Sequence, residues 1–336
     1  MSANSRLPRS CRGILLTLLL PAAFTAGRPA NGFSQQLIVS AEVNKTQFFE
    51  DEPIYLLVRL QNVGTDTAWT YFFSLLSPAV ALYVSRAHGK PVEVAKPVVD
   101  HIVRPSWRGE AVLPGACLPQ TMVLQDIMGD EQDIRSHLFA HHLAPDEYEL
   151  RLTFDAHGGV PRTRPLTVEA APIVFRVRQR TTAEEAEVRE LEAMRQMGSD
   201  TTRVAGHPRA AGYKTAVIEW VDRRTKAQPD DPFLPFLLSN GLYGVGQILW
   251  RHIQAGEVQR FDPDTSDVVS RLRLALIERH KSSAAGAYLV QVLSARHLDQ
   301  LAALADELGA TPSGDMARCQ VARNHPGQQP KKQPPR

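Results

Sequence analysis

Apolar and polar residues alternate along much of the first half of the chain, which is the period-2 pattern of strands with one buried face. Within Glu147–Asp155, the residues Tyr148, Leu150, Leu152 and Phe154 share one face. About eight or nine short runs of this kind, separated by turn residues and without a helical period, lie between residues 37 and 178. The pattern predicts an all-β domain of the immunoglobulin-like sandwich type.

One of these runs is apolar on both faces, which is typical of a fully buried strand. Its apolar residues are Ile54, Leu56, Val58 and Leu60 on one face and Tyr55 and Leu57 on the other. We therefore expect this run to be a central strand of its sheet.

The period changes to three or four residues after Thr181, where a helical half begins. Thr181, with Glu184 three residues later, is typical of a helix start that has a capping hydroxyl and acids in its first turn. Proline-marked joints between later apolar stripes, such as the break and cap at 228–232, predict αα-hairpins. A repeat of about 34 residues is not evident, so the array is expected to be short and only degenerately TPR-like. The last long helix is expected over Ala284–Leu308, ended by Gly309 and Pro312.

Together the patterns predict a two-domain chain that is all-β and then all-α. A length of 336 residues with 43% hydrophobic content is enough to bury two cores. The expected parts are a signal peptide at 1–26, an immunoglobulin-like β-sandwich at 37–178, a helix and linker at 179–208, an α-helical hairpin domain at 209–312 and a disordered, basic, Pro-rich tail at 319–336.

The first residues have the order of an export signal. Arg6, Arg9 and Arg12 form a positive head, and the apolar run Ile14–Phe24 precedes small residues. The run is shorter than the roughly 20 apolar residues that a transmembrane helix needs. We therefore expect a secreted or periplasmic protein, with a cleavage point that the sequence leaves open.

Net charge and cysteine content further restrict the classes of function that the sequence allows. Loss of the three signal arginines lowers the formal charge from +2 to −1, which gives no electrostatic basis for nucleic-acid binding. No second apolar stretch of membrane length follows, so no integral membrane segment is expected after signal cleavage. Cys117 and Cys319 remain after cleavage, and the sequence leaves open whether they form one disulfide or stay as free thiols.

Clusters of histidines and of acids are candidates for metal sites, but their sequence patterns depart from those of known metal sites. His137 and His141 have the spacing of a zinc-protease helix, but Leu138 stands where such proteins carry a catalytic Glu. One acidic cluster lacks the Gly and the closing Glu of a calcium loop, and helix capping by Asp264 or Thr265 explains it. The other lies in an expected loop, where it would bind a cation at low affinity or form a charged surface. No metal or cofactor is therefore expected. The acids in question are Asp262, Asp264 and Asp267 in one cluster and Asp126, Asp130, Glu131 and Asp133 in the other.

Aromatic residues give two further expectations. Trp69, Tyr71 and Phe73 fall on one face of a strand and would form a binding platform for a sugar or peptide if that face were exposed. Aromatic residues on a strand are more often part of the core, and this alternative stays open. Tyr148 stands where a tyrosine corner would place its hydroxyl against the upstream backbone. Nucleophile motifs and phosphate-binding loops are absent, so no catalytic residue is assigned.

The β region resembles exported bacterial proteins with an N-terminal immunoglobulin-like domain of the proteinase-inhibitor (BsuPI-like) type. The motifs that carry the resemblance are Phe49–Leu56, Leu60–Gly64, Leu113–Gly115 and Leu143–Tyr148. Asp146 departs from that pattern, which usually has Gly at this position. The helical half resembles the degenerate helical-repeat regions that follow such domains, and the resemblance implies no catalytic residue.

The sequence therefore favours an exported, non-enzymatic binding or scaffold protein that recognises a protein or glycan partner of the cell envelope. The sandwich would bind through its loops or an open edge strand, and the helices would offer a groove. One alternative is a hydrolase of envelope polymers with unidentified carboxylates, which two acids converging in one cleft at a catalytic separation would favour. The other is a proteinase inhibitor that uses the loop Pro105–Gly115.

Overall fold

The computed structural model describes residues 37–70, 73–75, 77, 79–86, 89, 92–93, 110–127, 139, 141–156, 167–199, 208–241, 267–291, 293 and 298–324. Residues Ser34–Arg336 form one compact unit. The expected signal peptide at 1–26 and residues 325–336 of the expected tail lie outside the described residues.

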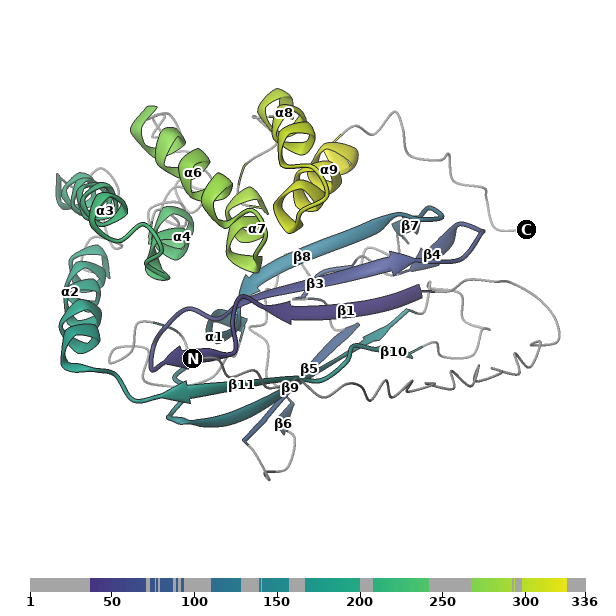
Figure 1. Cartoon of the computed structure of the whole chain (residues 1–336), viewed down its shortest axis with the longest axis horizontal. Coiled ribbons are helices and arrows are strands. Elements are labelled where there is room, and N and C mark those ends of the chain that lie inside the picture. The colour runs from purple at the N-terminus through teal and green to yellow at the C-terminus, as the bar shows by residue number, and fades with distance from the viewer. Residues whose placement is uncertain are drawn as a thin grey trace, which may run out of the picture. The chain divides into compact units, whose positions relative to one another are not determined.

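The described part of the first half is built from strands in three sheets (Figure 1). One sheet has the order β1-β3-β8, a second has the order β2-β11-β9-β5-β6 with β10 also paired to β9, and β4 pairs with β7. All pairings are antiparallel except that of β2 with β11. The strands are β1 (Leu37–Val43), β2 (Gln47–Phe49), β3 (Tyr55–Asn62), β4 (Ala68–Thr70), β5 (Val80–Arg86), β6 (Val92–Glu93), β7 (Glu110–Val112), β8 (Cys117–Val123), β9 (Asp146–Asp155), β10 (Thr167–Glu169) and β11 (Ile173–Arg178).

The expected central strand is confirmed, because β3 lies between β1 and β8. Its alternate residues enter two different cores, as the period of two requires. Leu56, Val58 and Leu60 belong to a core shared with the second sheet, which contributes residues such as Leu82 and Leu152. The two sheets therefore pack around one set of buried side chains.

Helices make up the described part of the second half, so the fold combines antiparallel sheets with helices. None of the described helices is long and apolar enough to span a membrane. The helices are α1 (Leu124–Ile127), α2 (Thr182–Ser199), α3 (Pro208–Ala227), α4 (Phe233–Phe236), the π-helix η1 (Leu237–Gly241), α6 (Asp267–His280), α7 (Ala284–Gln291), α8 (Leu298–Leu308) and α9 (Pro312–Asn324).

The C-terminal helices correct two expectations. The single helix expected over residues 284–308 is two helices, α7 and α8, and Pro312 begins α9 instead of ending the helical region. Pro312 fits a first helical turn because its missing N–H would have no intrahelical partner there. The Thr311 hydroxyl caps this turn by accepting a hydrogen bond from the backbone N–H of Gly314 at 3.2 Å. Residues 319–324, expected in the disordered tail, are therefore helical.

The helices pack on the outward face of the β1-β3-β8 sheet. Tyr55 and Leu57 of β3 are buried in the same core as helix residues, and the Tyr55 ring lies 5.3 Å from that of Tyr288 in α7. The Tyr55 hydroxyl donates a 2.7 Å hydrogen bond to the carbonyl of Pro232, just before α4. The apolar residues of β3 thus pack against the helices on one side of the sheet and against the second sheet on the other.

A glutamine side chain occupies the outer edge of β8. The Gln291 carboxamide accepts a hydrogen bond from the backbone N–H of Thr121 at 2.7 Å and donates one to its carbonyl at 2.8 Å. Thr121 also pairs with Leu57 of β3 on its other side. The end of α7 therefore satisfies the backbone groups that an edge strand leaves unpaired.

Candidate functional site

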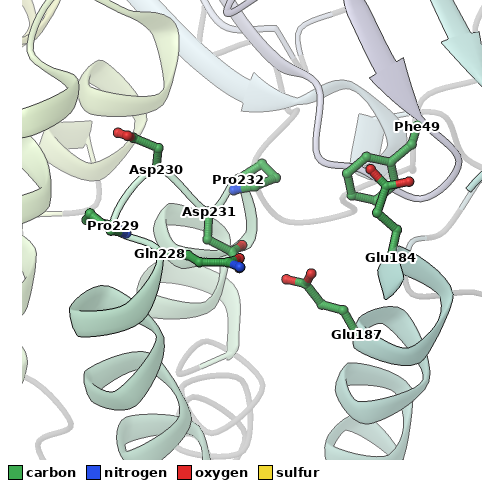
Figure 2. Close-up of a pocket in the computed structure, with 8 residues that line it drawn as sticks. All are labelled: Phe49, Glu184, Glu187, Gln228, Pro229, Asp230, Asp231 and Pro232. Carbon is green, nitrogen blue, oxygen red and sulfur yellow. The ribbon is translucent and has the colours of Figure 1, made fainter. Parts of the chain in front are cut away.

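A cavity of about 420 Å³ lies where the first half of α2 faces the turn between α3 and α4. Its walls come from three places in the chain: Phe49 at the end of β2, Glu184 and Glu187 on α2, and the turn 228–232. Figure 2 shows the carboxyl of Glu187 extending from α2 toward Asp231 on the opposite wall. The cavity is thus lined by carboxyl groups, an amide, prolines and one aromatic ring.

Arg224 of α3 connects the two walls. Its Nη2 lies 2.5 Å from Glu187 Oε2, and its Nε lies 2.5 Å from Asp231 Oδ2. The Asp231 side chain is 1% exposed, and its other oxygen accepts a 2.9 Å hydrogen bond from the backbone N–H of Phe233 at the start of α4. The sequence predicts a break and a cap at 228–232; the N-cap position of α4 is Pro232, and the side-chain hydrogen bond is accepted by Asp231 just before it.

The pKa of Glu187 is raised to about 8, mainly by burial and then by a hydrogen bond to Asp231 and the charge of Asp231, against the opposing effect of Arg224. Glu187 Oε1 is buried and receives no hydrogen bond from any residue that the structure describes. At neutral pH Glu187 is therefore largely protonated, which removes one negative charge from the surroundings of Arg224.

This pKa shift predicts a pH dependence of folding stability. The folded pKa of about 8 lies above the ordinary value of 4.5, so the native state binds more protons between these values and stability falls as pH rises through them. Glu187→Gln mimics the protonated acid and should remove most of this loss. Thermal melts of both proteins at pH values of roughly 6 and 9 test the expectation. The Glu190→Gln control should keep the wild-type slope, and equal slopes for wild type and Glu187→Gln would contradict the raised pKa.

The other acids of the cavity are also held by arginines. Glu184 accepts two hydrogen bonds from Arg178, at 2.8 and 2.6 Å, and one from the backbone N–H of Thr181 at 2.8 Å. These contacts lower the pKa of Glu184 to about 2, with the Arg178 hydrogen bond as the main cause. The predicted capping hydroxyl is confirmed, because Thr181 Oγ1 accepts a 3.3 Å hydrogen bond from the Glu184 N–H. Asp230 is bonded in the same way by Arg279.

One member of the histidine cluster, His142, pairs with an aspartate. His142 Nδ1 lies 2.9 Å from Asp51 Oδ1, and Arg180 approaches the other oxygen of Asp51 at 3.3 Å. The hydrogen bond to Asp51 raises the pKa of His142. Asp51 itself has φ 63°, a left-handed conformation that Asp tolerates better than most residues. His137 lies outside the described residues, and within the described ranges no group of three His, Cys, Asp or Glu residues is placed to hold a metal ion.

The candidate acidic clusters fall mostly outside the described part of the chain. Asp126 lies in α1 and Asp267 begins α6. The other members, Asp130, Glu131, Asp133, Asp262 and Asp264, are not among the described residues.

The aromatic platform does not form as a continuous exposed surface. Phe73 is 0% exposed and packs edge-on against Phe154 at 5.2 Å between ring centroids, so it is a core residue. Trp69 is half-buried on β4, and Tyr71 lies outside the described residues. The alternative that aromatic residues of this segment belong to the core therefore holds for Phe73.

Tyr148 is buried near the start of β9, and its hydroxyl donates a 2.8 Å hydrogen bond to the carbonyl of Ala144. Its ring stacks on Phe175 of β11 at 5.5 Å. The side chain therefore fixes the segment that leads into β9 to the adjacent strand.

Sequence reasoning did not select Glu187, Arg224 and Asp231 as a group. Glu187 is one of several acids on a polar helix face, and nothing in its local spacing distinguishes it from Glu190. The local sequence indicates no more than a break and a cap at the proline-flanked turn 228–232. The group exists because α2 and α3 pack side by side, which local sequence does not encode.

Fold and site together define a protein of antiparallel sheets and helices with a carboxyl-lined cavity between helices. No model of a known protein family matches the chain, and no curated protein matches it.

Weak likenesses to solved structures were found. One is to the Pseudomonas fluorescens alkylpurine DNA glycosylase AlkC bound to DNA with an abasic site analog, at 11% identity and TM-score 0.24 over 43% of this chain and 31% of that one. Another is to the sporulation control protein Spo0M of Bacillus subtilis, at 12% identity and TM-score 0.21 over 42% and 49%. A third is to a Listeria innocua β-glucosidase in complex with glucose, at 10% identity and TM-score 0.22 over 41% and 16%. The chain spans less than half the length of each of these proteins, so the chemistry of the site rests on its own geometry.

Proposed function

We propose that the chain is an exported, non-enzymatic binding or scaffold protein that recognises a protein or glycan partner of the cell envelope. The observation that carries the proposal is the cavity between α2 and the α3–α4 turn, whose polar groups are held in place by arginines. Concave sites with a few fixed polar groups are typical of ligand binding. Export rests on the pattern of residues 1–26.

The strand order supports an immunoglobulin-like sandwich for the β half. The sheet β1-β3-β8 corresponds to strands A, B and E of that fold, and β11-β9-β5 corresponds to G, F and C. In this alignment Tyr148 falls near the start of strand F, where a tyrosine corner is expected, and its hydrogen bond to Ala144 is the contact such a corner makes. For the helical half, the packing of neighbouring helices such as α8 on α9 supports αα-hairpins.

The carboxyl pair supports binding over glycoside hydrolysis. Hydrolases of this kind need carboxyl groups roughly 5 to 9.5 Å apart, so that a sugar or a water molecule fits between them. Glu187 and Asp231 both contact Arg224, which engages the two carboxyls that a hydrolase would need free for a sugar or a water molecule. The pair is thus suited to hold the cavity wall and present fixed polar groups.

The test compares two alanine variants of α2. Glu187 faces the cavity and contacts Arg224, whereas Glu190 lies outside it and pairs with the exposed Arg223 at 2.9 Å. Purified wild type, Glu187→Ala and Glu190→Ala are cosedimented with isolated cell-wall sacculi, and each is also crosslinked mildly in envelope fractions. We expect one saturable ligand, either the sacculi or one stoichiometric envelope protein, whose affinity falls about tenfold in Glu187→Ala and is unchanged in Glu190→Ala.

Melting curves of the three proteins confirm that each is folded at the binding temperature. Failure to bind both the sacculi and any stoichiometric protein would overturn the proposal. Release of soluble fragments from the sacculi by wild type, lost in Glu187→Ala, would replace it with a hydrolase.

A further inference from the structure

Two cysteines lie at the contact between β8 and α9. Cys117 begins β8 and is paired across the sheet with Gln61 of β3. Gln61 is an even number of residues from Tyr55 and Leu57, so Cys117 lies on the same outward face that the helices cover. Cys319 lies in α9, which packs against β8, and its side chain is 7% exposed.

Several contacts fix α9 over this part of the sheet. Arg323, one turn after Cys319, forms an ion pair with Glu110 of β7 at 3.1 Å. Gln320 donates a 3.5 Å hydrogen bond to the carbonyl of Gln291, whose side chain is itself bonded to Thr121 of β8. These contacts fix α9 to β7 and to the end of α7, and α9 itself packs against β8, the strand that carries Cys117.

The electrostatics of the two thiols agree with this placement. Burial raises the pKa of Cys117 to about 11, and the next contributions come from Asp315 of α9, Arg59 and the Cys319 thiol. Burial also raises the pKa of Cys319. Both sulfur atoms are free thiols in the structure. They are shielded and slow to react, because the thiolate is the reactive form.

We propose that Cys117 and Cys319 are the site of a single intramolecular disulfide that ties α9 to β8. The oxidant is another disulfide, either of low molecular weight or in a protein thiol oxidase. One thiolate attacks that disulfide and forms a mixed disulfide. The second thiolate then attacks the chain's sulfur in the mixed disulfide, which forms the Sγ–Sγ bond and releases the remaining thiolate of the oxidant. Two S–H bonds of the chain are lost, and the oxidant is reduced to two thiols. The inference concerns the fold and does not depend on the proposed ligand cavity.

The test uses the full chain carrying Cys11→Ser, so that Cys117 and Cys319 are its only thiols. The protein is treated with oxidised glutathione, both folded and during refolding from denaturant, because buried thiols react slowly in the native state. Intact-mass analysis and alkylation after unfolding then count free thiols. We expect a monomer that is two hydrogen atoms lighter, with no free thiol, and a crosslinked peptide pair that contains both cysteines.

The oxidised monomer should melt about 5 °C or more above the reduced one, because a crosslink that closes so long a loop restricts the unfolded chain. Cys117→Ala and Cys319→Ala should each abolish the crosslink and the oxidation-dependent shift. Persistence of both thiols after oxidative refolding, a glutathione adduct on Cys117 alone, or a disulfide-linked dimer would each overturn the proposal.

Discussion

Replacing Arg224 with alanine is expected to lower the free energy of unfolding by about 3 kcal/mol, the largest effect we predict for a charged residue of this protein. Its guanidinium contacts both Glu187 and Asp231 and lies 5.7 Å over the ring of Trp220. Asp231 is held at 1% exposure, so the variant leaves a buried carboxylate without its cation. Urea or guanidinium unfolding curves of the variant and wild type measure the difference.

The neighbouring residue provides a matched control. Arg223 also pairs with an acid of α2, Glu190, but its side chain is 66% exposed and that of Glu190 is 52% exposed. Exposed pairs of this kind contribute little, so Arg223→Ala should cost about 0.5 kcal/mol. If both variants lost the same stability, burial of the Arg224 trio would not be the reason for its importance.

Leu57→Ala is expected to cost about 3 kcal/mol and to shift one cooperative transition of sheets and helices together. Leu57 is 0% exposed and points from β3 into the core formed with the helices. Its neighbour Leu56 is equally buried but points into the core between the sheets. Leu56→Ala should cost a similar amount, so the pair tests two faces of one strand with the same chemical change.

Thermal unfolding followed in the far-ultraviolet at strand and helix wavelengths measures both variants. Coincident transitions, shifted by either substitution, are the expected result. A helical transition that moved in Leu57→Ala while the strand transition stayed in place would show that the helices unfold independently of the sheets.

The central strand could be predicted because its information is local. Alternation with a period of two, apolar on both sides, can be satisfied only by a strand covered on both faces, and β3 is such a strand. What covers each face was not predictable, since Leu57 meets helix residues that are far away in the sequence. The short strands β2, β7 and β10 carry too few residues to show a period at all.

The helix ends show a similar limit. Gly309 was correctly expected to stop a helix, and its φ of 56° is the left-handed conformation that favours glycine. Pro312 is compatible with either the end of one helix or the first turn of the next, and only the hydrogen bond from Gly314 to Thr311 decides for the second. The cavity is still harder to predict, because Glu187 differs from the other acids of α2 only through its contact with Arg224 of α3 and through Asp231 in the turn that follows α3.

The contact between Gln291 and Thr121 also bears on aggregation of the chain during its synthesis. An uncovered edge strand is a template onto which a strand from another molecule can add, and that addition leads to aggregation. Thr121 of β8 is synthesised before Gln291, which lies 170 residues further along the chain. Until α7 docks, this edge lacks the contact that would block such an addition.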